Sequence, residues 1–125
     1  MMRSFTPALF ACGIAYAAAA EGTQHPYPVA EIVTFRLVEG TDTAEFLAAA
    51  NDMGPYLQST GAMVKRTLSV DEVGLWTDHI LWTSRLAAEA AAAAMFERPE
   101  AQPFMAMIDP NGMDMRHARI ALQQE

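Results

Sequence analysis

Cysteine is nearly absent from this sequence: Cys12 is the only one among the 125 residues, and it lies in an apolar N-terminal stretch. The chain beyond that stretch has no thiol, which excludes a disulfide framework, a thiol nucleophile and a cysteine-based metal site there. A cysteine-free domain can occupy an oxidising compartment without mispairing, and packing alone must hold it together.

Basic residues are also few, with 8 Lys and Arg against 15 Asp and Glu and a formal net charge of −7. They are scattered along the chain, and Lys65 and Arg66 form the only adjacent pair. No basic stripe is present, so nucleic acid is not an expected partner. The sequence also has no phosphate-binding loop and no Ser-His-Asp order.

The first twenty residues resemble a secretory signal, since Arg3 is followed by an uncharged run that ends in small residues at Ala20. We expect cleavage near Ala20, a secreted or periplasmic location, and membrane contact only through this segment before cleavage. An uncleaved anchor and a lipoprotein attached through Cys12 are the alternatives. Residues 21–28 contain two prolines and predict a flexible leader.

The rest of the chain predicts one domain over residues 29–122 and a polar tail over 123–125. Apolar periodicity and turn residues favour, in chain order, a strand, a helix, two strands, a helix with a second short piece, and a strand. Gly54-Pro55 should break the first helix. The expected ranges are 29–38, 41–60, 61–70, 75–84, 85–98 with 100–108, and 113–122.

The strand over residues 75–84 should be central, because it has large apolar side chains on both faces. The whole order predicts an α+β, ferredoxin-like βαββαβ fold: a four-stranded antiparallel sheet with both helices on one face. Val33, Phe35 and Leu37 form the cleaner apolar side of the first strand and should lie under the helices. We expect a second copy to cover the other face of the sheet.

Several segments resemble the dimeric α/β-barrel superfamily, particularly small proteins related to antibiotic biosynthesis monooxygenases. The similar segments are Ile32–Leu37, Gly74–Asp78 with Trp82–Ser84, Pro103–Asp109 and Met115–His117. The resemblance implies a dimeric α/β barrel whose two facing sheets enclose a lumen for a small organic ligand. Members include cofactor-independent monooxygenases, isomerases and haem-binding proteins, so the fold does not choose the activity.

Candidate site residues come from the central and last strands. Asp78 and His117 are the catalytic candidates, since a carboxylate between two Trp and a strand imidazole could form an acid/base couple. Trp76, Trp82 and Arg36 are the expected ligand-binding residues of the lumen. Alternation places His79 opposite Asp78.

A structural interpretation competes with the catalytic one. Asp78 would then be ion-paired with Arg36 or Lys65, and a one-residue change of register would bring either Lys65 or Arg66 beside it.

Neither a metal nor a cofactor is expected, although a haem on His117 or His79 stays open. Clustered methionines such as Met105 and Met115 favour core packing over copper binding. Three functions follow. The first is an exported homodimer that binds a small, largely apolar molecule, and the second is a cofactor-independent monooxygenase or isomerase. The third is a non-catalytic assembly subunit, in which Trp and Met side chains fill the lumen.

Overall fold

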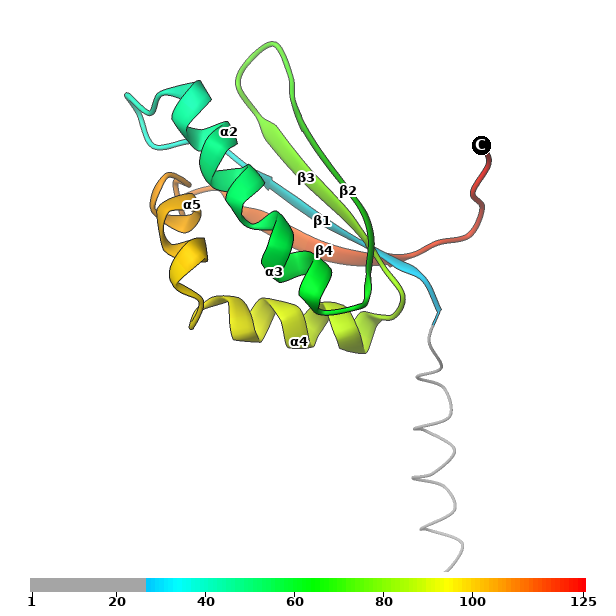
Figure 1. The fold of residues 1–125 in the computed structure, drawn as a ribbon. Coiled ribbons are helices and arrows are strands. Elements are labelled where there is room, and N and C mark those ends of the chain that lie inside the picture. Colours follow the sequence, from blue (N-terminus) through cyan, green and yellow to red (C-terminus); the bar gives the residue numbers. More distant parts are fainter. Residues whose placement is uncertain (1–26) are drawn as a thin grey trace, which may run out of the picture.

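The order of strands and helices is the one that the sequence predicts (Figure 1). The computed structural model describes residues 27–125, so the predicted signal lies outside the described residues. The elements are β1 (Val29–Phe35), α2 (Thr43–Asp52), α3 (Gly54–Ser59), β2 (Met63–Val70), β3 (Trp76–Trp82), α4 (Arg85–Met95), η2 (Pro99–Ala101), α5 (Gln102–Ala106) and β4 (Asp114–Arg119).

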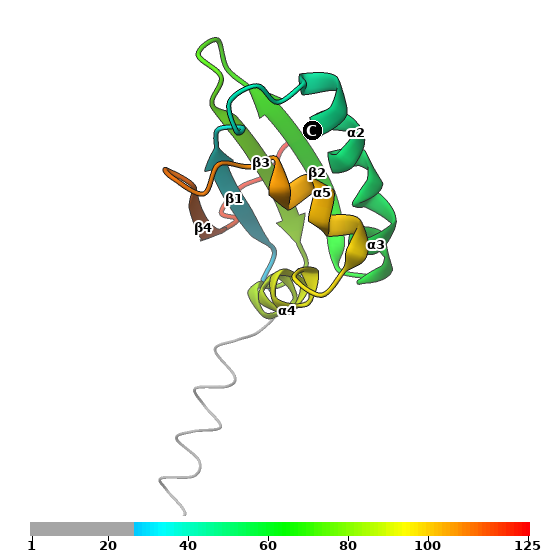
Figure 2. The same cartoon turned by 90° about the vertical axis from the view of Figure 1, so that its left-hand side faces the viewer.

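The strands form one antiparallel sheet in the order β2-β3-β1-β4, with the helices on one face. The predicted ferredoxin-like fold and the interior position of β3 are therefore confirmed. Figure 2 shows β4 at the edge of the sheet that lies away from α2 and α3. This edge strand is the part of the sheet that the helices cover least.

Local sequence explains where the helices begin and end. Asp42 caps α2 by accepting a hydrogen bond from the amide of Ala44 at 3.0 Å, and Ser84 caps α4 in the same way. Pro55 stands in the first turn of α3, where the missing amide hydrogen costs nothing, so the expected break separates α2 from α3. The two short helices can thus follow the twist of the sheet.

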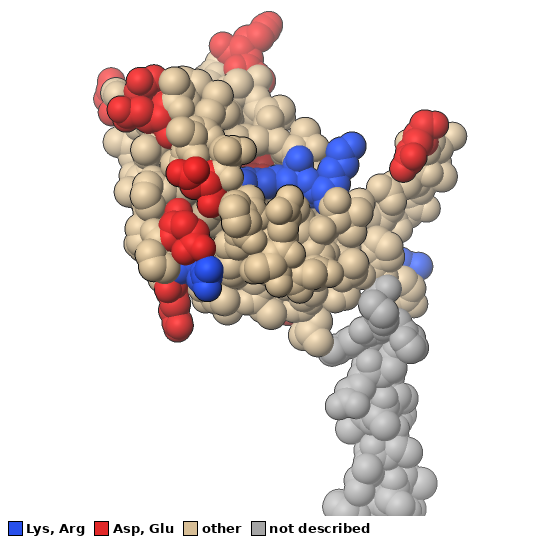
Figure 3. All heavy atoms as spheres, in the orientation of Figure 1, with Lys and Arg blue, Asp and Glu red and all other residues tan. Residues whose placement is uncertain are grey.

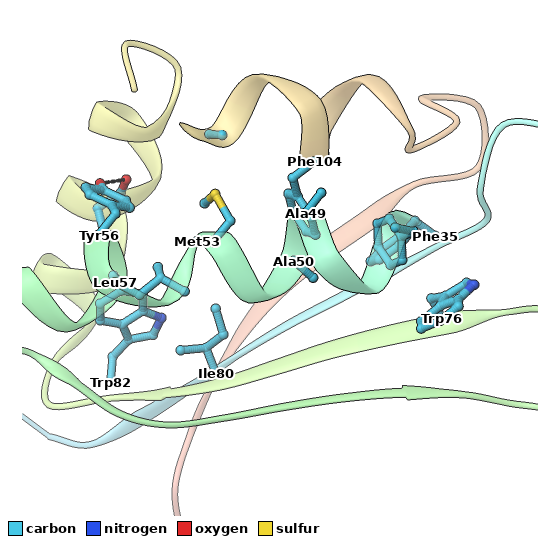
Figure 4. Packing of buried hydrophobic residues seen from close by; sticks show 14 of the residues in the cluster. Phe35, Ala49, Ala50, Met53, Tyr56, Leu57, Trp76, Ile80, Trp82 and Phe104 are labelled. Carbon is cyan, nitrogen blue, oxygen red and sulfur yellow. Dashed lines mark hydrogen bonds between the residues drawn. The ribbon is translucent and has the colours of Figure 1, made fainter. Parts of the chain in front are cut away.

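The core lies between the sheet and the helices (Figure 4). Phe46 of α2 is fully buried in it. Its ring centroid lies 4.9 Å from that of Trp76, 5.4 Å from Phe104 and 5.8 Å from Phe35. Alanines on α4 allow that helix to approach closely, and Ala88 is completely buried. These contacts fix the helices over β1 and β3.

The opposite face of the sheet is more polar than the sequence pattern suggests. In β1 and β3 it carries the buried Ala30 and Leu81 together with Ile32, Thr34, Thr77 and His79, which all face away from the helices because their neighbours face the core. The apolar area on this face is therefore smaller than expected. Within residues 27–125, no helix is long and apolar enough to cross a membrane.

Candidate functional site

A cavity of about 290 Å³ lies between the sheet and the helices, on the same side as the core. It is roughly twice the size of an engineered cavity of about 150 Å³ that holds benzene. Its apolar walls come from both layers: Val33, Phe35, Met53, Leu57, Ile80, Trp82, Ala91, Ala92, Met95, Phe96, Phe104, Met105, Ile108, Pro110, Met113 and Met115. The charged lining residues are Glu31, Arg66 and Asp78.

The cavity opens beside β4, where helix cover is thin. Phe96, Met113 and Met115 line it, yet their exposed fractions are 69%, 48% and 45%. Methionine side chains are flexible and polarisable, so a wall that includes them can adapt to ligands of different shape. The side chains that the sequence assigns to core packing thus also form the wall of this cavity.

Asp78 is held in a buried ion pair with Arg66 of β2. Arg66 donates from Nε to Oδ1 at 3.0 Å and from Nη2 to Oδ2 at 2.8 Å. Its Nη1 donates to the carbonyl oxygen of Ala50 at 2.8 Å, and the guanidinium lies over the ring of Phe104. This bidentate geometry occupies both carboxylate oxygens, which favours a structural role for Asp78 over a role as a free base.

A β-bulge decides which basic residue reaches Asp78. The pairing of β2 with β3 shifts between Met63 and Lys65, after which Arg66 lies opposite Ile80 on the helix side. Lys65 then faces the other side of the sheet with Leu81. The predicted partners Arg36 and Lys65 are therefore wrong, and the alternative register with Arg66 is correct.

His117 pairs with Glu31 of β1 and not with Asp78, whose partner is Arg66. His117 Nε2 lies 3.3 Å from Oε2 of Glu31, directly across the β1–β4 ladder. Oε1 of the same carboxylate accepts a hydrogen bond from Nε1 of Trp82 at 3.2 Å. The expected Asp78–His117 couple is thus replaced by a Glu31–His117 couple, in which a buried carboxylate is oriented by two side chains.

Glu31 is the site residue that the sequence interpretation missed. It is only 6% exposed and lines the cavity. One signal could have found it: it is the single acidic residue of β1, and alternation places it on the same face as Val33 and Phe35. A charged residue within an apolar period is either paired or functional.

The other predicted site residues separate. Trp82 lines the cavity, whereas Trp76 packs in the core and is not part of the wall. Arg36 is exposed at the end of β1 and donates from Nη1 to the carbonyl oxygen of Val73 at 2.6 Å, so it does not line the cavity. His79 is exposed on the face of the sheet that points away from the helices, called the open face below, and thus lies opposite Asp78 as alternation predicts.

The expected location of the site also changes. From the sequence, Trp76, Asp78 and Trp82 should line a lumen between two sheets, but in the structure they face the helices of the same chain. The β1–β3 register explains this, because Asp78 lies opposite Val33 and Trp76 opposite Phe35, and paired residues share a face. Since Val33 and Phe35 lie under the helices, their partners must lie there too.

Metal-ligating residues do not gather in the part of the chain that the structure describes: residues 27–125 contain no group of three or more His, Cys, Asp or Glu placed to hold a metal ion. His117, one of the two haem-ligand candidates, has Nε2 against Glu31. His79, the other candidate, lies outside the cavity.

No protein-family model matches this sequence, and no curated protein matches it significantly. Solved structures do share the fold. A single-site variant of SnoaB, a cofactor-independent oxygenase from Streptomyces nogalater, has a TM-score of 0.63 at 16% identity, covering 77% of this chain and 95% of SnoaB.

Two further structures extend the likeness. A proposed antibiotic biosynthesis monooxygenase from Caulobacter crescentus has a TM-score of 0.64 at 10% identity, covering 83% of this chain and 99% of the other. A second one, from Bordetella bronchiseptica, has a TM-score of 0.64 at 13% identity, with 77% and 99% covered. These likenesses confirm the predicted ferredoxin-like fold, which the antibiotic biosynthesis monooxygenases share.

Proposed function

We propose that this protein binds a small, largely apolar organic molecule in the cavity between its sheet and its helices. The cavity carries the proposal, because all but three of its lining residues are apolar and Arg66 and Asp78 neutralise each other. Concave, mostly apolar sites with a few polar groups are the usual form of small-molecule sites. Open space of this size also counts against the assembly-only function, which requires side chains to fill the site.

The test replaces one of two neighbouring alanines of α4 by phenylalanine. Ala92 lines the cavity, whereas the next residue, Ala93, is exposed and does not. Ala92→Phe should fill part of the cavity and weaken binding of naphthalene at least tenfold, while Ala93→Phe should leave the affinity unchanged. Binding is measured by calorimetry, and by the rise in unfolding midpoint that a ligand of the native state causes.

Two results would contradict the proposal. The first is a wild-type protein that naphthalene does not saturate. The second is equal naphthalene affinity of the Ala92→Phe and Ala93→Phe variants while both keep the wild-type circular dichroism spectrum. A rise of about 2.7 kcal/mol in stability is expected at a ligand concentration of about 100 times Kd.

Turnover is a second candidate function, and the Glu31–His117 couple favours it. A carboxylate held in an apolar cavity can take a proton from a carbon next to a carbonyl group and return it, as an isomerase does. The likeness to SnoaB, which is named as a cofactor-independent oxygenase, supports the same candidate only through the fold. Asp78 is excluded from the role of base here because Arg66 occupies it.

Proton exchange tests this second candidate without knowledge of the substrate. The α-protons of 2-tetralone should exchange with D2O faster in the presence of the wild-type protein, and Glu31→Gln should remove the acceleration. His117→Ala should reduce it in part, because the carboxylate loses one of its orienting groups. No acceleration by wild type would end the turnover proposal and leave the binding proposal intact.

We propose further that two copies pair through the open face of the sheet and that the mature chain is exported. Ile32, Thr34 and Thr77 are partly exposed on that face, beside the exposed His79. Light scattering should give the mass of a dimer, and Thr77→Glu should give a monomer while Ala93→Glu on α4 does not. A wild-type monomer at all concentrations would refute the pairing.

The intact mass of the protein from the exported fraction tests cleavage near Ala20.

A further inference from the structure

The charges of the residues that line the cavity do not balance. Arg66 and Asp78 cancel, which leaves Glu31. Its hydrogen-bond partners are the neutral indole of Trp82 and the imidazole of His117. Within residues 27–125, no Lys or Arg nitrogen forms an ion pair with Glu31. Because its partners include no Lys or Arg, a buried carboxylate of this kind gains from pairing with a cation that enters the cavity.

We propose that the preferred ligand is an apolar molecule with a protonated primary amine, whose ammonium group pairs with Glu31. This inference rests on the proposed binding function and adds the charge of the ligand. Each carboxylate oxygen of Glu31 receives one contact, at 3.2 Å from Trp82 and at 3.3 Å from His117. Because each oxygen has two lone pairs, both can accept a further hydrogen bond from an ammonium group.

The rest of the cavity suits the same ligand. Its wall contains the aromatic rings of Phe35, Trp82 and Phe104, whose faces attract cations, while the aliphatic and Met side chains suit an apolar body. The net charge of −7 favours the approach of cations. Figure 3 shows acidic side chains over the start of α2 and around the segment between α4 and α5. A ligand carboxylate would instead meet Glu31 and be repelled.

Three naphthalene probes of similar size separate ligand charge from ligand shape: 2-naphthylmethylamine, 2-methylnaphthalene and 2-naphthoate. Near neutral pH, the wild-type protein should bind the ammonium probe at least tenfold more tightly than the neutral probe, and the carboxylate probe at least tenfold more weakly. Calorimetric titration of the full mature chain gives the three affinities. Glu31→Gln should make the ammonium and neutral probes bind equally, because the amide has the same shape without the charge.

A matched control separates the local charge from the overall charge. Glu97 is exposed at the end of α4, so Glu97→Gln removes one negative charge without touching the cavity and should keep the tenfold preference. If Glu31→Gln does not fold, the carboxyl ¹³C signal of Glu31 in the wild-type protein decides instead. It should shift on addition of the ammonium probe and much less on addition of 2-methylnaphthalene.

Equal affinity of the wild-type protein for the ammonium and neutral probes would overturn the inference and leave the binding function standing. Binding of none of the three probes would refute the binding function itself. Loss of the ammonium preference in Glu97→Gln would also overturn the inference, since overall charge would then explain it. The same preference in Glu31→Gln as in wild type would assign the effect to another group and overturn it too.

Discussion

Replacing Asp78 by leucine tests whether this residue is structural. The side chain of Asp78 is 7% exposed and that of its partner Arg66 is 14% exposed, so the substitution leaves a guanidinium buried without its carboxylate. Breaking a buried pair by removing one member costs about 3–5 kcal/mol. That is a large part of the roughly 5–15 kcal/mol of an ordinary domain.

Replacing both members should restore much of the lost stability. In Arg66→Met with Asp78→Leu, no charge remains buried, and such apolar replacements are often neutral or even stabilising. The carbonyl oxygen of Ala50 loses the Arg66 donor, but it still accepts a hydrogen bond from the amide of Met53 at 3.2 Å. We therefore expect the stability losses of Asp78→Leu and Arg66→Met, added together, to exceed the loss of the double variant by about 2 kcal/mol or more.

Urea unfolding of the wild type, the two single variants and the double variant gives these free energies, provided that the slope of the transition is the same in all four. The reasoning fails if Asp78→Leu lowers the free energy of unfolding by less than about 1 kcal/mol, which is the upper end of the usual range for an exposed pair. It also fails if the double variant loses the full sum of the single losses. Either result would return Asp78 to the groups that are free to act on a ligand.

Three further predictions concern stability. Burial raises the pKa of Tyr56, whose hydroxyl donates to the carbonyl oxygen of Ala91 at 2.6 Å, so the unfolded state ionises first and stability should fall as pH rises above about 10. Tyr56→Phe should lose about 1 kcal/mol near neutral pH and much of that alkaline slope in urea titrations. Phe46→Ala should cost about 3–5 kcal/mol, against less than about 0.5 for exposed Leu47→Ala, both measured by urea unfolding. Gly74 has a φ of +85°, so Gly74→Ala should lower the free energy of unfolding by about 1 kcal/mol or more, which is measured as a lower melting temperature.

Local pattern was sufficient for the elements and their order. The β-branched run of β1, the Gly54-Pro55 break and the Ala-rich helix before Pro99 are all short-range signals, and each element lies within a few residues of its predicted range. Turn residues performed equally well, because Asp71 accepts hydrogen bonds from the amides of Val73 and Leu75 and Gly74 adopts the left-handed conformation. Such signals depend on neighbours in the chain, which a sequence displays directly.

The candidate site was predicted only in part. Asp78, His117 and Trp82 were singled out because polar or large aromatic side chains within a strand are unusual, and all three lie on the helix side of the sheet. Arg36 was wrong as a lining residue, because β1 ends at Phe35 and the arginine turns to the carbonyl oxygen of Val73. Glu31 was missed because its two partners belong to β3 and β4, and the pattern of β1 alone does not display them.

The sequence by itself determined the fold class, the central strand and the two sets of residues that alternate along each strand. Only the tertiary structure decided which set of the central strand the helices cover and which side chains meet across the sheet. Glu31 lies 51 residues from Trp82 and 86 from His117, and Arg66 reaches Asp78 only because a bulge shifts one strand. Strand periodicity repeats every two residues and carries no information on such distant pairing, so the register and the helix packing had to be known before the cavity and the partners of Glu31 could be identified.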